Sequence, residues 1–135
     1  MNSSFREKQA RLFVVLVVED DAFLRDIMVR KLREAGGYEV LESTTAEEGL
    51  DVVKERKPDL VLLDLILPGM DGFHFLECVK GNPATASIPV IILSNFGQKA
   101  EMERGAALGA AKYLIKAHMS PLEIVDEVKR FFEGT

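Results

Sequence analysis

The sequence predicts an α/β domain, in which a doubly wound parallel sheet of five strands carries five helices on its two faces. Strand-like and helix-like segments alternate strictly along the chain, and such alternation builds a parallel sheet through right-handed crossovers. Three strand-like segments are unbroken apolar runs, which is typical of strands buried on both faces. These runs begin at Leu12, Leu60 and Val90, so we place them in the middle of the sheet and two shorter strands at its edges.

Local signals define each element in chain order. Strands are expected at residues 12–18, 38–41, 59–63, 90–93 and 112–115, and helices at residues 22–35, 45–56, 73–80, 98–108 and 121–132. The first helix has apolar side chains at intervals of three and four residues, which gives it one apolar face, and Gly36-Gly37 ends it. The second helix stops at Lys57-Pro58, and its start offers several capping residues: Thr44 or Thr45, with Glu47 or Glu48 for a capping box.

The three later helices have start signals of different strength. The apolar run of the third strand is ended by Pro68-Gly69 and Asp71-Gly72, and Asp71 is in position to cap the next helix. The helix at 98–108 has the weakest signal, because Gly105 lies inside it and an interior glycine costs about 1 kcal/mol relative to alanine. A Ser-Pro-Leu-Glu segment at residues 120–123 starts the last helix with a cap, a proline in the first turn and a glutamate at capping-box distance.

Composition and charge limit the function classes that fit the chain. A chain of 135 residues, 47% hydrophobic and 29% charged, corresponds to one globular domain. The net charge of −5 argues against nucleic-acid binding as the main activity, since an acidic surface is repelled by a phosphate backbone. The single cysteine, Cys78, excludes an internal disulfide and fits a reducing compartment such as the cytoplasm. We expect Cys78 to pack in the core.

The amino-terminal residues imitate a secretion signal without matching one. Basic residues within 1–11 precede the apolar run 12–18, but this run is short and ends in three acids instead of a small-residue cleavage site. No segment approaches the roughly 18 to 20 apolar residues of a membrane span. We therefore expect residues 1–11 to form an amino-terminal tail, either loose or with a short extra helix, and residues 12–135 to form the domain.

Polar side chains follow four of the predicted strands at their carboxyl ends. They are Glu19-Asp20-Asp21, Asp64, Ser94-Asn95 and Lys116. In open α/β sheets ligands bind at this edge, so we expect these side chains to converge on one pocket. Each also has an ordinary interpretation. An acid can bind its own loop, a serine or lysine can be solvated, and Asp21 can cap the helix that follows it.

From about Leu12 to Phe132, the chain resembles the receiver domains of two-component response regulators. The resemblance rests on residues of the right type at the right strand ends: Glu19-Asp20, Asp64 followed by Leu67-Pro68-Gly69-Met70-Asp71-Gly72, Ser94 and Lys116. It implies the flavodoxin-like receiver fold with strand order 2-1-3-4-5. It also implies a signalling module whose only chemistry is its own phosphorylation and dephosphorylation, and not an enzyme.

The resemblance gives each strand-end residue a role. Asp64 would accept a phosphoryl group from a phosphohistidine on a sensor histidine kinase or a histidine phosphotransfer protein. Lys116, Ser94 and the backbone amide of Asn95 would bind the phosphoryl oxygens and neutralise their charge. Packed acids repel each other and would hold a hard divalent cation with oxygen ligands, for which Mg²⁺ is the best candidate. Its ligands would be Asp20 and Asp64 directly, the backbone carbonyl of Ile66, and Glu19 through water.

The resemblance also implies how the domain signals. Ser94 would move toward the phosphoryl group while Tyr113 turns inward, and the surface of segments 98–108, 112–115 and 121–132 would shift. The alternative for Tyr113 is an aromatic side chain packed at the sheet edge. The partners would be the phosphohistidine donor and a downstream protein target or effector domain, and a phosphorylation-dependent dimer is compatible with this scheme. We expect no contact of this domain with nucleic acid or membrane.

Two function classes fit the sequence. The first is the phosphorylation-dependent signalling module with Mg²⁺, and the alternative is a flavodoxin-like protein-binding or scaffold module that is not phosphorylated. The acid pair together with Asp64, Ser94 and Lys116 favours the first. A phosphate-loop enzyme is disfavoured because the chain has no glycine-rich loop that ends in Lys-Ser or Lys-Thr. His74 and His118 have no partner at ligand spacing, so we assign them no chemistry.

One position departs from the family pattern, in which proline usually follows the lysine. Here Ala117 follows Lys116. A cis bond before alanine costs roughly 2.5 to 4 kcal/mol, against about 0.5 to 1 kcal/mol before proline. We therefore expect a trans bond, with residues 117–120 rearranged so that the lysine still reaches the pocket. Asn95 and Phe96 also differ from many family members and should affect access to the phosphoryl group.

Overall fold

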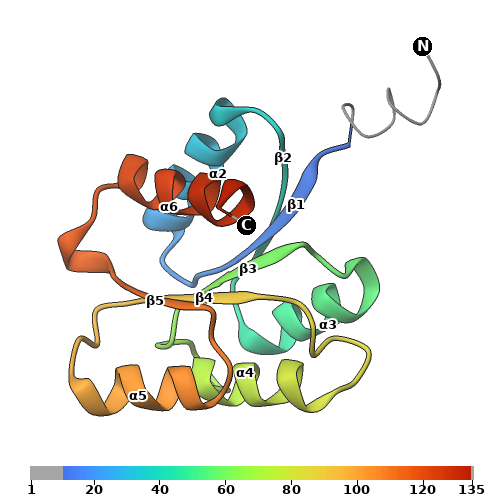
Figure 1. Ribbon diagram of the computed structural model, residues 1–135, viewed down its shortest axis with the longest axis vertical. Coiled ribbons are helices and arrows are strands. Elements are labelled where there is room, and N and C mark those ends of the chain that lie inside the picture. Colours follow the sequence, from blue (N-terminus) through green and yellow to red (C-terminus); the bar gives the residue numbers. More distant parts are fainter. Residues whose placement is uncertain (1–10, 135) are drawn as a thin grey trace.

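A parallel sheet of five strands forms the middle of the molecule in the computed structural model, which describes residues 11–134 (Figure 1). The strand order is β2-β1-β3-β4-β5, as predicted, and the three apolar runs supply the central strands. The strands are β1 (Phe13–Val18), β2 (Tyr38–Ser43), β3 (Leu60–Leu63), β4 (Val90–Ser94) and β5 (Lys112–Ile115). The expected amino-terminal tail, apart from Arg11, lies outside the described residues.

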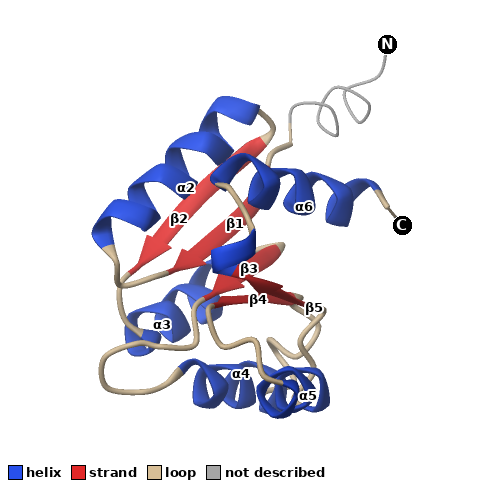
Figure 2. Cartoon of the chain, turned by 90° about the vertical axis from the view of Figure 1, so that its left-hand side faces the viewer, coloured by secondary structure: helices blue, strands red, loops and turns tan. Residues whose placement is uncertain are grey.

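Five α-helices cover the two faces of the sheet within the described part of the chain. They are α2 (Ala22–Ala35), α3 (Ala46–Arg56), α4 (Gly72–Gly81), α5 (Lys99–Ala107) and α6 (Pro121–Glu133). α2 and α6 lie on one face, and α3, α4 and α5 lie on the other (Figures 1 and 2). The prediction for α2 is confirmed at both ends. The predicted ranges of α3 and α6 are wrong by one residue at one end, and those of α4 and α5 by one residue at both ends.

The helix starts follow the capping chemistry expected from the sequence. The side chain of Asp21 accepts hydrogen bonds from the backbone amides at the start of α2, and the side chain of Asp71 does so for α4. Thr45, not Thr44, caps α3. Ser120 and Glu123 form the complete capping box at the start of α6. Each such cap contributes about 1 kcal/mol, so these positions fix where the helices begin.

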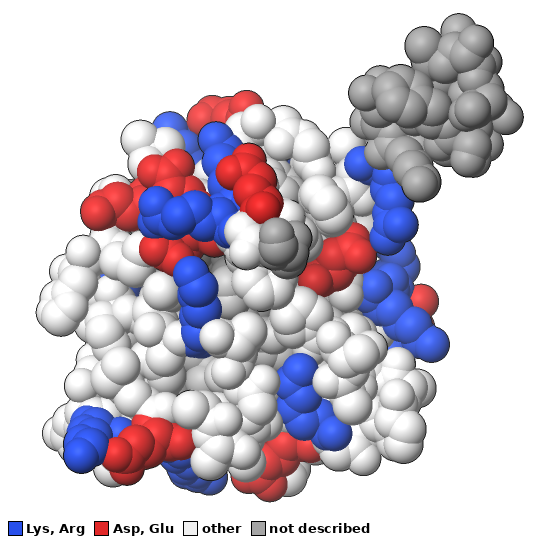
Figure 3. Space-filling model, in the orientation of Figure 1, with Lys and Arg blue, Asp and Glu red and all other residues white. Residues whose placement is uncertain are grey.

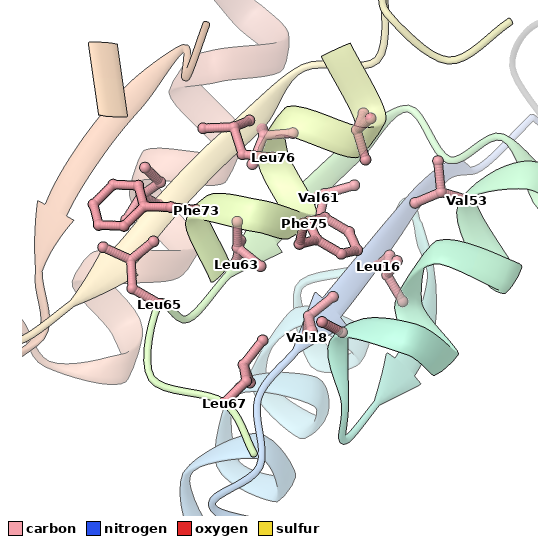
Figure 4. Packing of buried hydrophobic residues seen from close by; sticks show 14 of the residues in the cluster. Leu16, Val18, Val53, Val61, Leu63, Leu65, Leu67, Phe73, Phe75 and Leu76 are labelled. Atoms are coloured by element: carbon pink, nitrogen blue, oxygen red, sulfur yellow. The ribbon is translucent and has the colours of Figure 1, made fainter. Parts of the chain in front are cut away.

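Strand side chains point alternately into two hydrophobic cores, one on each face of the sheet. Leu16 and Val18 pack with α3 and α4 in the core shown in Figure 4, which also contains the fully buried Phe75. Val15 and Val17 point to the opposite core, beneath α2 and α6. Both faces of β1 are therefore apolar, and this explains why its sequence shows no polar alternation.

Two packing features away from the pocket were not predicted from the sequence: the position of Cys78 and a group of aromatic rings around Phe132. The prediction that Cys78 packs in the core is wrong: Cys78 is half-buried and lines a cavity of about 320 Å³ between α3 and α4. The ring of Phe13 at the start of β1 stacks on that of Phe132 near the end of α6, with centroids 4.2 Å apart and planes at 13°. Tyr38 at the start of β2 lies 5.9 Å from the same Phe132 ring.

Candidate functional site

The strand register brings the predicted site residues to one edge of the sheet. Val18 pairs with Leu63 in the parallel ladder, so the next residues, Glu19 and Asp64, lie side by side. The backbone N–H of Asp64 continues this ladder by donating to the carbonyl of Val18 over 3.0 Å. On the side of β3 away from β1, strand β4 pairs with β3 and strand β5 pairs with β4, and both pairs are parallel. The carboxyl ends of β1, β3, β4 and β5 therefore meet around one pocket.

Three carboxylates form the acidic part of this pocket. Glu19, Asp20 and Asp64 each place a carboxylate oxygen within 4.8 Å of the others. Glu19 is 1% exposed and Asp64 is 7% exposed, whereas Asp20 is at the surface. Hard divalent cations such as Mg²⁺ prefer ligands of this kind, and the arrangement leaves one charged ligand accessible from solvent. The donor set thus fits the cation that the sequence suggested.

Lys116 lies between the two buried acids. Its Nζ is 2.6 Å from Glu19 Oε1 and 3.2 Å from Asp64 Oδ2, and its side chain is 14% exposed. Burial lowers the pKa of Lys116, but the contacts with Glu19 and Asp64 outweigh this effect and raise the pKa above its ordinary value. The lysine is therefore a partly buried cation that compensates two buried anions.

The peptide bond between Lys116 and Ala117 is trans, as predicted, since residues 11–134 contain no cis peptide. After the lysine the chain forms a single turn of 3₁₀ helix, η1 (Lys116–His118), which was not predicted from the sequence. The N–H of Met119 closes this turn on the carbonyl of Lys116 over 3.2 Å. A short helical turn therefore delivers the lysine to the pocket without a proline.

The pocket changes the ionisation of Glu19. Burial raises its pKa, the contact with Lys116 lowers it, and the negative charge of Asp64 raises it again. The result is a pKa raised from 4.5 to about 6. The carboxylate also accepts a hydrogen bond from the backbone N–H of Asp21 over 3.1 Å. Near neutral pH Glu19 is thus a charged group held at a cost to the stability of the fold.

Replacing Glu19 by glutamine should stabilise the domain when no divalent cation is present. Because the pKa in the folded state is above the unfolded value of 4.5, the free energy of unfolding falls as the pH rises from 4.5 to about 6 and Glu19 ionises. We expect Glu19→Gln to recover about 1 kcal/mol at pH 7, less than the full shift implies because the substitution also removes the ion pair with Lys116. Urea denaturation at several pH values measures this difference. A gain that is as large at pH 4.5 as at pH 7 would contradict the explanation.

Two hydrogen bonds order the loop after β3, which begins at Asp64. The N–H of Ile66 donates to Asp64 Oδ1 over 3.3 Å, and the N–H of Gly72 donates to the carbonyl of Leu65 over 2.9 Å. A Cβ atom at Gly72 would lie 2.6 Å from both the carbonyl oxygen of Asp64 and the Cα of Leu65. Only glycine therefore allows the start of α4 to approach the backbone of Asp64 this closely. Whether the carbonyl of Ile66 binds metal stays a prediction.

The residues predicted to respond to phosphorylation share a contact with the loop after β4. The fully buried Ser94 accepts a hydrogen bond at Oγ from the N–H of Phe96 over 3.1 Å. The hydroxyl of Tyr113 donates to the carbonyl of the same Phe96. Asn95 is exposed between them. Ser94 and Tyr113 thus bind the two polar groups of one peptide segment, which the sequence alone did not indicate.

Arg25 is a contributor to the site that the sequence analysis missed. It lies in the first turn of α2, and its Nη1 donates to the carbonyl of Glu19 over 2.9 Å. A signal was present in the sequence, because helical side chains point toward the amino terminus of their helix. A long basic side chain shortly after the cap therefore lies over the preceding loop, which here carries the acids.

The sheet order and the acidic pocket at its carboxyl edge define a CheY-like signalling domain. Residues 15–129 match the family model described as the response regulator receiver domain, and the chain belongs to this family. It is thus the receiver domain of a two-component regulator with an acidic phosphorylation site. Receiver domains are signalling phosphoacceptors and not classical enzymes.

Relatives of known sequence and structure agree with this assignment. The chain is 36% identical over 121 residues to the phosphate regulon transcriptional regulatory protein PhoB of Pseudomonas aeruginosa, covering 90% of this chain and 52% of PhoB. A CheY-like receiver domain protein from Methanospirillum hungatei superposes with a TM-score of 0.81 at 26% identity, covering 91% and 95% of the two chains. The chemotaxis response regulator CheY4 of Vibrio cholerae gives 0.81 at 26% identity, covering 88% and 98%.

The chain spans about half the length of the curated PhoB relatives that it matches. Within the described residues, no helix has the length and apolar character needed to cross a membrane.

On the face shown in Figure 3, basic and acidic side chains are interspersed among uncharged ones. Interspersed charges of both signs give that face little electrostatic attraction for a polyanion.

Proposed function

We propose that Asp64 is the phosphoacceptor and that it takes its phosphoryl group from a phosphohistidine. The observation that carries this proposal is the position of Asp64, a buried carboxylate 3.2 Å from the ammonium group of Lys116 at the end of a central strand. Glu19 is also buried beside Lys116, but it is 1% exposed against 7% for Asp64, so Asp64 is the more accessible nucleophile of the two. A partner histidine kinase or histidine phosphotransfer protein follows from membership of the family.

The acids Glu19, Asp20 and Asp64 would hold Mg²⁺, with Asp20 and Asp64 as direct ligands, the carbonyl of Ile66 as a further ligand and Glu19 acting through water. The metal supplies charge neutralisation that lets an anionic carboxylate approach an anionic phosphoryl group. The depth of Glu19, which is 1% exposed, supports an indirect role. The surface position of Asp20 supports a direct one.

Lys116, Ser94 and the Asn95 backbone amide would bind the phosphoryl oxygens. Lys116 already compensates Glu19 and Asp64, so once a cation neutralises the acids, its ammonium group can pair with the phosphoryl group instead. The hydroxyl of Ser94 now accepts from Phe96, and its own proton remains available for donation. These groups would position charge around the transferred group.

Phosphorylation would alter the surface formed by α5, β5 and α6 through Ser94 and Tyr113. Both side chains bind the backbone of Phe96, so a movement of Ser94 toward the phosphoryl group would change the partner of the tyrosine. A downstream protein target or effector domain would read this change, with a phosphorylation-dependent dimer as one outcome. Because the proposed donor is phosphorylated by a kinase that uses ATP, the proposed location is the cytoplasm.

Direct mapping of the modified residue tests the proposal. The full chain is incubated with a small phosphodonor and Mg²⁺, and the phosphorylated peptide is identified by mass spectrometry. We expect one acid-stable, base-labile phosphoryl group per chain, on Asp64. Modification of a different residue, or none under conditions that modify a known receiver domain, would overturn the assignment and favour a non-phosphorylated binding module.

The metal site should depend on Asp20 and much less on its neighbour Asp21. Asp20→Ala removes a charged ligand and should weaken Mg²⁺ binding at least tenfold, which is about 1.4 kcal/mol. Asp21→Ala removes the cap of α2 and should cost about 1 kcal/mol of stability while changing the metal affinity little. Calorimetric titration with Mg²⁺ measures both variants. Equal losses of affinity would show that the metal ligands are assigned to the wrong acids.

A further inference from the structure

Arg25 fastens the loop that carries the acids Glu19 and Asp20. Its Nη1 donates to the carbonyl oxygen of Glu19 over 2.9 Å and lies 3.5 Å from that of Asp20. Its Nε donates to Glu42 Oε1 on β2 over 3.3 Å. The Arg25 side chain is only 17% exposed, so these bonds are partly shielded from water. One guanidinium group therefore links the backbone of the acid loop to a neighbouring strand.

The planar guanidinium group suits this arrangement better than any other side chain. It offers donors in a fixed fork, so one edge can bind carbonyl oxygens while Nε binds a carboxylate. The acid loop has two further attachments: the Glu19 N–H donates to the carbonyl of Ser43 over 3.0 Å, and Glu19 Oε2 accepts from the N–H of Asp21. Arg25 is the attachment that reaches the carbonyls of both Glu19 and Asp20. Its contacts therefore restrain the backbone of both residues.

We propose that Arg25 is a positioning residue for cation binding: it fixes the backbone of Glu19 and Asp20, so that the carboxylate of Asp20 faces Asp64. Glu42 acts with it by holding the guanidinium group in place. The inference rests on the proposed function, in which these acids hold Mg²⁺. It adds a residue outside the pocket that sets the affinity of the site.

The direction in which Mg²⁺ affinity changes when Arg25 is replaced distinguishes a positioning role from a purely electrostatic one. Arg25 is a cation close to a proposed cation site, and by charge alone its removal should strengthen Mg²⁺ binding. If Arg25 acts by positioning, its removal should weaken Mg²⁺ binding instead. Loss of groups that orient metal ligands typically costs 10- to 100-fold in affinity. We expect the lower end of this range, because the loop retains its bonds to Ser43 and Asp21.

The experiment measures Mg²⁺ affinity of the unphosphorylated full chain by calorimetry. Arg25→Met should raise the dissociation constant about tenfold. Arg25→Lys keeps the charge but cannot bind Glu42 and the carbonyls together, and it should raise the constant by at least about threefold. Arg30→Met is the matched control: Arg30 is on the same helix and donates to Asp26 of that helix, so its loss removes a cation without removing a contact with Glu42 or the acid loop. It should change the constant less than about twofold.

A second comparison tests whether Arg25 acts through Asp20. In an Asp20→Ala background, Arg25→Met should add less than about twofold, since the ligand it positions is gone. A residue with only a structural role would lower the unfolding midpoint and leave the Mg²⁺ constant unchanged. That result, or tighter binding in Arg25→Met, would overturn the inference while leaving the proposed function intact. Absence of Mg²⁺ binding by the wild type would overturn the metal site and the inference together.

Discussion

Asp64→Asn is expected to abolish phosphoryl uptake. An asparagine amide has nearly the shape of the carboxylate but carries no negative charge and is not a nucleophile under these conditions. The backbone contacts of residue 64 with Val18 and Gly72 do not depend on its side chain, so the fold should be kept. Incubation with a small phosphodonor and Mg²⁺, followed by intact-mass measurement, should show no added phosphoryl group.

Asp71→Asn provides the control for this result. Asp71 is on the same loop and caps α4 through a hydrogen bond from the N–H of His74 over 2.9 Å, a role that asparagine fills equally well. This variant should be phosphorylated to the same extent as the wild type. Full labelling of Asp64→Asn would show that another residue accepts the phosphoryl group.

Gly72→Ala should cause the largest loss of stability among simple substitutions near the site. The added methyl group would lie 2.6 Å from two backbone atoms, the Asp64 oxygen and the Leu65 Cα, and neither can move without displacing the loop. Overpacking of this kind costs typically 1 to 3 kcal/mol, and we expect about 3 kcal/mol because both obstructing atoms belong to the backbone. Urea denaturation measures the loss.

Gly81, at the other end of α4, is the matched control. A Cβ there meets no atom within 4 Å, and its φ is outside the left-handed region. Gly81→Ala should be neutral or stabilise the domain by about 0.5 kcal/mol, since alanine is the better helix former. Equal losses from the two substitutions would mean that helix propensity, and not contact with Asp64, decides the requirement for glycine.

Most of the fold could be predicted because its signals are local. The unbroken apolar run of β1, the caps Asp21 and Asp71 and the capping box of α6 each act over a few residues. The β2 strand extends two residues beyond its predicted end because Glu42 and Ser43 pair with Val17 and Val18 of β1. Pairing across a sheet overrides the polar character of an edge strand, and the sequence of that strand alone does not contain this information.

The pocket could be predicted as a set of residues but not as a geometry. That Lys116 contacts both Glu19 and Asp64 depends on the η1 turn, which has no distinctive sequence signal. The position of Arg25 after the helix cap indicates that its side chain lies over the preceding loop, but the atoms that it binds there follow only from the fold. Cys78 lies at a helical position with core periodicity, but the gap between α3 and α4 leaves it half-buried.

The stack of Phe13 on Phe132 brings the beginning of β1 next to the end of α6. The chain can therefore be closed into a ring by a short flexible linker from residue 134 to residue 11 and reopened elsewhere, with every packed element retained. The exposed Gly36-Gly37 turn is a suitable place for the new termini. Because this turn is at the amino edge of the sheet, opposite the acids, a circularly permuted domain could carry a fused reporter there without covering the pocket.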